Sequence, residues 1–165
     1  MKELTEQQAL SRLAAECSRG EHCSGEMLEK MRKWELAEDA QARIMEYLIS
    51  HQYIDDERFT RLFVKDKMLF NKWGRRKIEQ ALWMKHVDES IYKKILDEIG
   101  ENEWKTILSS LVKAKRKSIK AASDYERKLK LMKFSMSRGF TMDIIRQCVG
   151  DVDEVEDHEE YAEDY

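Results

Sequence analysis

The sequence contains no proline and only six glycines in 165 residues, so it has few residues that kink or end a helix. Residues that favour strands are also scarce, with four threonines and six valines, and no segment alternates strictly between apolar and polar positions. Leu, Lys, Glu, Met, Ala and Arg dominate instead, and these residues favour helix. We therefore predict an all-α fold.

Sequence motifs of the common enzyme classes are absent. The chain has no Walker A loop and no GxSxG, HExxH or GxGxxG pattern, which argues against the usual nucleotide-binding, hydrolase and zinc-protease sites. The histidines are scattered and the cysteines form no CxxC pair; they are His22, His51, His86, His158, Cys17, Cys23 and Cys148. We therefore expect no catalytic residue, metal or other cofactor. Because no signal peptide or long apolar run is present, we expect a reduced cytoplasmic setting.

Positive and negative charges are unevenly distributed along the chain. Charged residues make up 38% of the sequence, and the net charge is −3. Residues 151–165 hold nine acids and no Lys or Arg, whereas residues 1–150 hold 30 bases against 24 acids. A basic body followed by an acidic tail is typical of a protein that binds an anion or a charged partner. A solvated surface with a disordered tail explains the same charges, and both interpretations stay open at this point.

Apolar residues recur in three series with the same spacing. Each series takes steps of four, five, four and four residues, and the second and third series begin 51 and 53 residues after the one before. The steps of four indicate a buried helix stripe, and the step of five indicates a tight bend between two helices. We expect Phe134 to fill the gap left by the polar Ser135 in the third series. The series are Met27, Met31, Leu36, Ala40 and Ile44; Ile78, Leu82, Val87, Ile91 and Ile95; and Leu131, Ser135, Phe140, Ile144 and Cys148.

Another apolar helix pattern precedes each series, so the sequence predicts three copies of a three-helix unit. We place these repeats at 1–52, 53–100 and 101–150, followed at 151–165 by an acidic tail that we expect to be disordered. Because each repeat buries little apolar surface alone, neighbouring repeats should stack into an elongated, curved array. The predicted helices are 5–19, 24–34, 37–50, 56–71, 75–85, 88–99, 102–121, 124–137 and 141–149.

Capping residues support these helix boundaries. Asp55 and Asp56 can cap the helix that begins the second repeat and complement its dipole. Glycines stand where three helices are expected to stop, at Gly100, Gly139 and Gly150. Two pairs have the spacing of a capping box: Thr5 with Gln8, and Ser123 with Glu126.

Two clusters of cations are the candidate partner contacts. The first surrounds Gly74 at the expected start of a helix, where free backbone N–H groups also favour an anion. The second runs from 113 to 120 with no acid between its members. Cations beside an aromatic residue suit a phosphate backbone, but they equally suit acidic residues of a protein, and a solubilising surface is a third explanation. The candidates are Lys72, Trp73, Arg75, Arg76 and Lys77 in the first cluster and Lys113, Lys115, Arg116, Lys117 and Lys120 in the second.

The segment YIDDERFTRLFV, followed by WGRRKIEQAL, resembles the RecX family of recombination regulators. The family pattern is a turn of Tyr, Ile and two Asp, then an Arg-Phe helix start and, further on, a glycine that leads a basic helix with Ile and Leu. SGEMLEKM and KFSMSRGF are similar to segments of the family's first and third units, so the resemblance covers roughly residues 5–150. The residues that match the central pattern are Tyr53, Ile54, Asp55, Asp56, Arg58, Phe59, Gly74, Lys77, Ile78 and Leu82.

The resemblance implies three tandem three-helix repeats and a regulatory protein that is not an enzyme. It implies binding to the RecA recombinase and to its filament on single-stranded DNA, with damping of strand exchange, co-protease activity and ATP hydrolysis in DNA repair and the SOS response. We expect weak direct DNA binding, no membrane association and a monomeric chain. The alternative is a stand-alone helical nucleic-acid-binding module with phosphate-clamping basic clusters. A DNA-binding helix-turn-helix motif is a variant of that alternative. The sequence supports it only weakly, because no bend precedes an obvious recognition helix.

Overall fold

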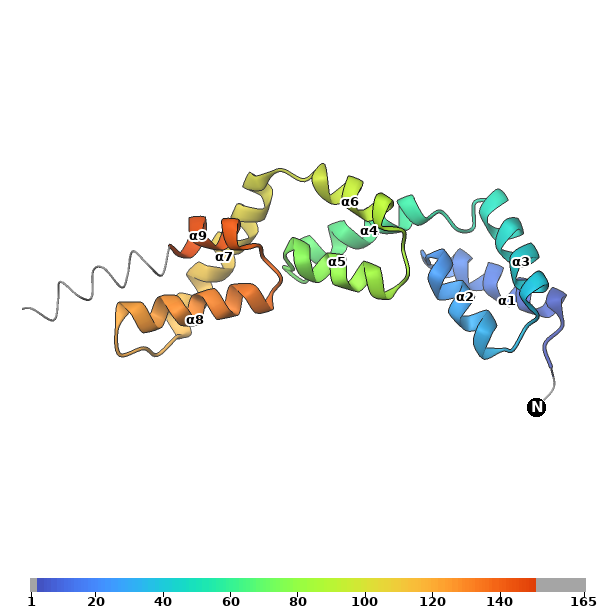
Figure 1. Cartoon of the computed structure of the whole chain (residues 1–165), viewed down its shortest axis with the longest axis horizontal. Helices are drawn as coiled ribbons and strands as arrows, with labels where there is room; N and C mark the ends of the chain where they lie inside the picture. The colour runs from blue at the N-terminus through green and yellow to red at the C-terminus, as the bar shows by residue number, and fades with distance from the viewer. Residues whose placement is uncertain (1–2, 151–165) are drawn as a thin grey trace, which may run out of the picture. The chain divides into compact units, whose positions relative to one another are not determined.

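A computed structural model describes residues 3–150, and the predicted acidic tail at 151–165 lies outside the described residues. Nine α-helices and no strand make up the described part, which confirms the all-α prediction (Figure 1). None of these helices is long and apolar enough to cross a membrane. The helices are α1 (Glu6–Arg19), α2 (Ser24–Lys33), α3 (Glu38–Ser50), α4 (Asp56–Leu69), α5 (Arg75–Met84), α6 (Glu89–Asp97), α7 (Glu101–Ser118), α8 (Asp124–Ser137) and α9 (Met142–Val149).

The chain divides into two compact units. Within the described residues, unit 1 comprises 3–63 and 81–95, and unit 2 comprises 64–80 and 96–150. Unit 1 therefore combines α1, α2 and α3 with parts of α4, α5 and α6, and unit 2 combines the other parts of those three helices with α7, α8 and α9. The middle three helices contribute to both units, and the repeat boundaries at 1–52, 53–100 and 101–150 stay a prediction.

Three bends in the chain share one backbone structure. After α2, α5 and α8, a residue with positive φ ends the helix: 56° at Glu35, 61° at His86 and 93° at Gly139. The next residue is apolar, and its backbone N–H donates to a carbonyl five positions earlier at 3.1–3.2 Å, as in a Schellman motif. The three bends are 51 and 53 residues apart, the offsets that the apolar series predict. The apolar residues that close them are Leu36, Val87 and Phe140.

The predicted capping residues act at two helix starts. Thr5 and Gln8 form the predicted box, because the N–H of Gln8 donates to Thr5 Oγ1 at 3.1 Å and the N–H of Thr5 donates to Gln8 Oε1 at 3.0 Å. Ser123 caps α8 by accepting from the N–H of Glu126 at 3.0 Å. The carboxylate of Glu126 accepts from the N–H of Ala122, one residue before the cap, at 2.9 Å.

Two of the three predicted stop glycines end a helix. Gly139 follows α8 with φ 93°, and Gly150 caps α9 with φ 102°, so both adopt a conformation that other residues rarely take. Gly100 instead has φ −72° and is the N-cap of α7, where Glu103 accepts its N–H at 2.9 Å. The predicted stop at Gly100 is therefore wrong, because glycine is also well tolerated at an N-cap.

Most members of the three apolar series are buried in the cores, and the polar Ser135 is buried with them. The Ser135 hydroxyl donates to the carbonyl of Leu131 at 2.7 Å, so its burial leaves no unpaired donor. Phe134 is only half-buried, and the cationic groups of Lys115 and Arg138 lie 5.2 and 5.8 Å from its ring centre. The expectation that Phe134 takes the place of Ser135 in the core is therefore wrong.

Candidate partner-binding surfaces

The turn from Tyr53 to Asp56 joins α3 to α4 in unit 1. The carbonyl of Leu48 accepts from the backbone N–H groups of Tyr53 at 2.9 Å and Ile54 at 3.1 Å, and Ile54 is buried in the unit 1 core. Asp55 then caps α4, because its carboxylate accepts from the backbone N–H of Arg58 at 3.0 Å. The first half of the turn thus ends one helix, and the second half begins the next.

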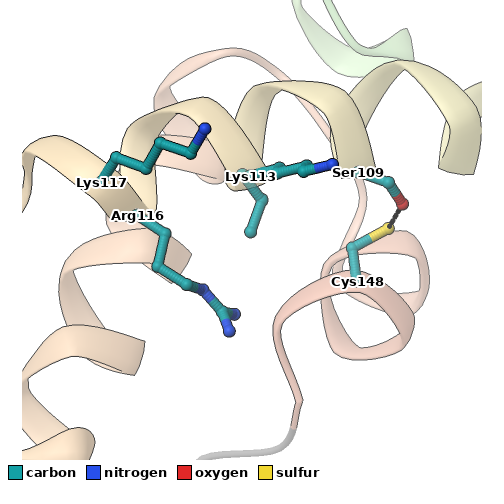
Figure 2. Close-up of a pocket in the computed structure, with 6 residues that line it drawn as sticks. Ser109, Lys113, Arg116, Lys117 and Cys148 are labelled. Atoms are coloured by element: carbon teal, nitrogen blue, oxygen red, sulfur yellow. Dashed lines mark hydrogen bonds between the residues drawn. The ribbon is translucent and has the colours of Figure 1, made fainter.

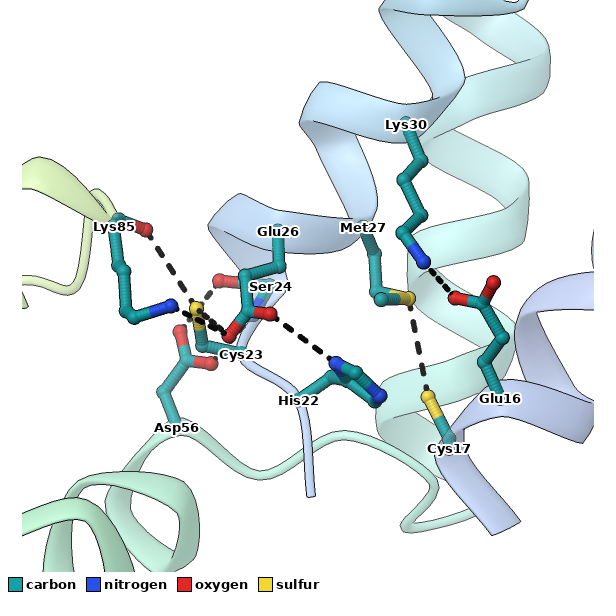
Figure 3. A network of polar contacts seen from close by, with 10 residues as sticks. All are labelled: Glu16, Cys17, His22, Cys23, Ser24, Glu26, Met27, Lys30, Asp56 and Lys85. Atoms are coloured by element: carbon teal, nitrogen blue, oxygen red, sulfur yellow. Dashed lines mark hydrogen bonds and ion pairs between the residues drawn. The ribbon is translucent and has the colours of Figure 1, made fainter. Parts of the chain in front are cut away.

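Asp56 has a partner outside its own helix. Its carboxylate accepts from the backbone N–H of Ser24 at 2.7 Å and from the Ser24 hydroxyl at 2.5 Å (Figure 3). Cys23, at the N-cap of α2, makes no capping bond with its side chain, so Asp56 supplies the acceptor that α2 lacks. The prediction that both aspartates cap α4 is therefore confirmed for Asp55 and wrong for Asp56, although Asp56 lies in the first turn of α4, where its charge suits the dipole.

Further contacts join the start of α2 to the bend after α5. Glu26 accepts a hydrogen bond from Cys23 at 3.4 Å and pairs with Lys85 Nζ at 3.6 Å, and His22 Nδ1 lies 3.2 Å from its other oxygen (Figure 3). Gly25 is needed here, because a Cβ at this position would lie 2.0 Å from the carbonyl oxygen of Lys85. This network is therefore a packing site between two helix ends.

Burial and the neighbouring groups shift two pKa values in this network in opposite directions. Burial raises the pKa of Cys23 to about 12, so the thiol stays protonated. Burial also raises the pKa of Glu26, but hydrogen bonds from His22 and Cys23 and the charge of Lys85 outweigh it, and the pKa lies below its ordinary value.

The other residues of the central motif also serve the fold. Arg58 donates to Glu21 at 2.7 Å and to the carbonyl of Gln52 at 3.0 Å. Tyr53 is half-buried and Phe59 is buried in unit 1, as is Leu82, whereas Ile78 is buried in unit 2. The motif residues therefore position backbone and core, and the cationic side chains remain the candidates for partner contact.

The start of α5 packs on the bend after α8 in unit 2. The backbone N–H of Gly74 donates to the carbonyl of Arg138, and the N–H of Arg76 donates to the carbonyl of Gly139, both at 2.8 Å. A Cβ at Gly74 would lie 2.4 Å from the backbone nitrogen of Phe140, so only glycine allows this approach. The expectation of free backbone N–H groups at this helix start is therefore wrong for Gly74 and Arg76. Contact of the cationic side chains with an anion stays a prediction.

The two packing sites are related in sequence. The start of α2 meets Lys85 and His86, and the start of α5 meets Arg138 and Gly139, which lie 53 residues further along. Sequence reasoning missed both contacts and the backbone role of Arg138. The signals that could have found them are the glycine at each helix start and the repeat offset, which aligns the two bends.

Arg75 is occupied within the protein. Its guanidinium donates to Glu79 at 2.7 Å and to Asp97 at 2.6 Å, and its side chain is 27% exposed. Burial lowers the pKa of Arg75, but the bonds to the two carboxylates outweigh it, so the pKa lies above its ordinary value. Arg75 therefore stabilises unit 2, and its predicted contact with a partner would need both ion pairs to open.

Trp73 lies between two cations. The ammonium groups of Lys67 and Lys77 lie 5.1 and 4.9 Å from the centre of its ring, a cation–π arrangement. Lys72 precedes it with φ 57°, and the backbone N–H of Trp73 donates to the carbonyl of Lys67 at 3.0 Å. Since its ring is already engaged with lysines, Trp73 is a support for Lys77 rather than an open stacking surface.

Two residues of the first cluster line a hollow of about 430 Å³ between α5 and α8. Arg76 is exposed and Lys77 is half-buried, and neither forms an ion pair within residues 3–150. Gln80, Met136, Ser137 and Gly139 complete the lining. The structure thus brings Arg76 and Lys77 together beside an exposed methionine, while Lys72 and Arg75 stay outside this lining.

The second cluster lines another hollow, of about 410 Å³, between α7 and α9 (Figure 2). Lys113, Arg116 and Lys117 are exposed on α7, and Ser109 and Cys148 face each other with 3.4 Å between oxygen and sulfur. Among the described residues that line it, none is acidic. Three predicted contact residues therefore share one concave surface.

Lys115 and Lys120 lie apart from that hollow. Lys115 is placed over the ring of Phe134 at 5.2 Å. The helix ends at Ser118, three residues before its predicted end, so Lys120 lies in the following loop, where its carbonyl accepts from Lys130 Nζ at 2.6 Å. The five cations therefore do not all surround one helix.

Positive charge is concentrated in unit 2. Its segments 64–80 and 96–150 contain 18 Lys and Arg against nine Asp and Glu, whereas unit 1 contains 12 against 15. Most cations of unit 1 pair with a carboxylate, as Arg58 does with Glu21. Within the described residues, the unit 2 cations that form no ion pair include Arg76, Lys77, Lys113, Arg116 and Lys117. Unit 2 is therefore the surface best suited to a polyanionic or acidic partner.

Known proteins similar to this chain place it in a family. Family models described as the RecX second and third three-helix domains match residues 55–96 and 101–149. The regulatory protein RecX of Chlorobium limicola is 30% identical over 126 residues, which cover 76% of this chain and 75% of that protein. The chain belongs to the RecX family. The RecX protein of Acinetobacter baylyi is 28% identical over 83% of both chains.

Not all RecX relatives match over their whole length. The matched segment spans 50% of the Clostridium tetani protein, at 29% identity, and 29% of the Lactobacillus gasseri protein, at 34% identity. Solved structures share the fold: RecX from Lactobacillus salivarius has a TM-score of 0.78 and 21% identity over 90% of this chain. A second RecX crystal structure has a TM-score of 0.80 and 18% identity over 88% of this chain.

Proposed function

We propose that this RecX-family chain binds the RecA recombinase and its filament on single-stranded DNA and lowers recombinase, ATPase and co-protease activity. The family supports a regulatory role, since its relatives are named regulatory proteins. The observation that carries the proposal on this chain is the excess of cations in unit 2, 18 against nine acids, several of them without an ion pair. A filament of acidic protein surfaces and DNA phosphates is a partner that such a surface attracts.

The mode of action is binding rather than catalysis, in the cytoplasm, by a monomeric chain. Arg76 and Lys77 on α5, with Lys113, Arg116 and Lys117 on α7, are the proposed contacts. Because these side chains are exposed or half-buried, their attraction to a partner should weaken as salt rises.

The experiment adds the purified protein to RecA on single-stranded DNA with ATP. ATP turnover and strand exchange should fall as the protein approaches the concentration of RecA, and a pull-down should retain RecA. No change in either rate at a clear excess would end the proposal.

A stand-alone nucleic-acid-binding module is the second candidate, and the hollow lined by Lys113, Arg116 and Lys117 favours it. Its test is the affinity for a fluorescent single-stranded oligonucleotide without RecA, measured over a range of salt. The RecA proposal expects weak binding with a steep salt dependence, whereas tight, sequence-selective binding would favour the second candidate.

A further inference from the structure

The hollow between α7 and α9 has the composition of an anion site. Three cationic residues, Lys113, Arg116 and Lys117, line it together with Ser109 of the same helix, and Cys148 of α9 lies across from Ser109 (Figure 2). Guanidinium and ammonium groups bind carboxylates and phosphates through charge-assisted hydrogen bonds. No acid in the described lining neutralises them, so the hollow lacks an internal counter-ion.

The sequence that follows this hollow supplies matching charge. Asp151 comes three positions after Cys148, and residues 151–165 contain nine acids and no base. The described part of unit 2 has nine more bases than acids, so its net charge is equal and opposite to that of segment 151–165. The chain also leaves α9 beside another cation, since a Cβ at Gly150 would lie 3.5 Å from Nζ of Lys128.

We propose that the hollow between α7 and α9 binds carboxylates of segment 151–165 of the same chain. Because the acids are joined to the site by a few residues, their effective concentration is on the order of millimolar, far above that of a separate ligand. The segment then competes with any other polyanion for Lys113, Arg116 and Lys117. This inference stands without the RecA proposal, and its tests contain no RecA.

Exposed ion pairs are weak one at a time and are screened by salt, so occupancy of the hollow depends on ionic strength. At low salt the segment should cover the cations, and at high salt it should leave them. A competitor of this kind favours partners that carry more negative charge than the segment itself.

Carbodiimide coupling tests the contact directly, because it joins a carboxylate to a nearby lysine amine. In the full-length protein at low salt, mass spectrometry should find acids of 151–165 joined to Lys113 and Lys117. Lys33 and Lys94 are the controls, since they are exposed in unit 1 and form no ion pair within residues 3–150. A mixture of ¹⁴N- and ¹⁵N-labelled protein separates links within a chain from links between chains. Links spread equally over the control lysines, or links between chains only, would overturn the proposal.

Competition provides the second test, with a short oligothymidylate as the probe. A variant with all nine acids of 151–165 replaced by amides should bind it roughly three- to tenfold more tightly at low salt than the natural chain. This gain in affinity should disappear when both chains also carry Lys113→Gln, Arg116→Gln and Lys117→Gln. The gain in affinity should persist when both chains instead carry Arg12→Gln, Lys33→Gln and Lys94→Gln, which remove the same number of charges from unit 1. An equal gain in both backgrounds would show an effect of net charge alone and would contradict occupancy of the hollow.

Discussion

The backbone N–H of Gly74 donates to the carbonyl of Arg138 at 2.8 Å and brings the start of α5 against the bend after α8. A methyl group at Gly74 would lie 2.4 Å from the nitrogen of Phe140 and 2.5 Å from the carbonyl carbon of Gly139, both of them backbone atoms that cannot move aside alone. We predict that Gly74→Ala lowers the free energy of unfolding by about 1–3 kcal/mol, the usual cost of overpacking. Urea unfolding followed by circular dichroism measures this.

Gly20→Ala is the matched control, because no atom outside the adjacent residues lies within 4 Å of a Cβ built there and φ is −177°. It should leave the unfolding midpoint close to that of the natural chain. Equal effects of the two substitutions would show that the close approach at Gly74 does not exist in solution.

Arg75 and Arg76 are adjacent, but only Arg75 forms ion pairs within the described residues. Arg75→Gln removes the partner of both Glu79 and Asp97 and should lower the free energy of unfolding by about 1 kcal/mol, within the range for partly exposed ion pairs. Arg76→Gln should change it by less than about 0.5 kcal/mol, because Arg76 forms no ion pair in the described part of the chain. Thermal melting of both variants distinguishes them, and a larger loss for Arg76→Gln would refute this division.

Asp56 stabilises the start of α2 from a distance in sequence. Asp56→Asn keeps the shape but removes the charge that accepts from the Ser24 N–H and hydroxyl, so we expect a loss of about 1 kcal/mol. Hydrogen exchange at the Ser24 amide should become faster. Glu57→Gln, one position later, removes only an exposed pair with Arg61 and should cost less than about 0.5 kcal/mol. Unchanged exchange at Ser24 in Asp56→Asn would count against the contact.

Glu26 should make unit 1 less stable as the pH falls into the acid range. Because its pKa is lower in the folded than in the unfolded chain, its contribution is fully present above its ordinary pKa of about 4.5 and is lost as the pH falls through the folded pKa. Glu26→Gln should therefore destabilise the protein at neutral pH and have little effect at the lowest pH at which the chain still folds. Unfolding curves from pH 7 downward test this, and a constant difference at every pH would contradict it.

The parts of the fold that local sequence determines were predictable. Helix α5 was expected at 75–85 and spans Arg75–Met84, because its apolar spacing and flanking bend are local signals. The link from Asp56 to Ser24 and the link from Gly74 to Arg138 join residues 32 and 64 positions apart, and no local pattern specifies such a partner. The cations were found as clusters, but only the structure separates the ion-paired Arg75 from Arg76.

Positive φ angles at residues other than glycine could not be predicted from residue type. Glu35, Gln52, Lys72 and His86 all have positive φ without being glycine, so the rule that glycine marks such a position misses them. Glu35 and His86 lie 51 residues apart, and the apolar residue after each of them, Leu36 or Val87, closes the bend. Repeat periodicity is therefore a better guide to the bends at Glu35 and His86 than residue type.

The most direct test of the proposed function is the ATPase rate of RecA on single-stranded DNA, titrated with three forms of the protein. The natural chain should inhibit as it approaches the concentration of RecA. Arg76→Glu with Lys77→Glu should need at least about tenfold more protein, because reversed charge repels an acidic partner. Arg12→Glu with Lys94→Glu, the same charge change on exposed residues of unit 1, should inhibit like the natural chain. Equal inhibition by all three forms would contradict the account, as would no inhibition by any of them.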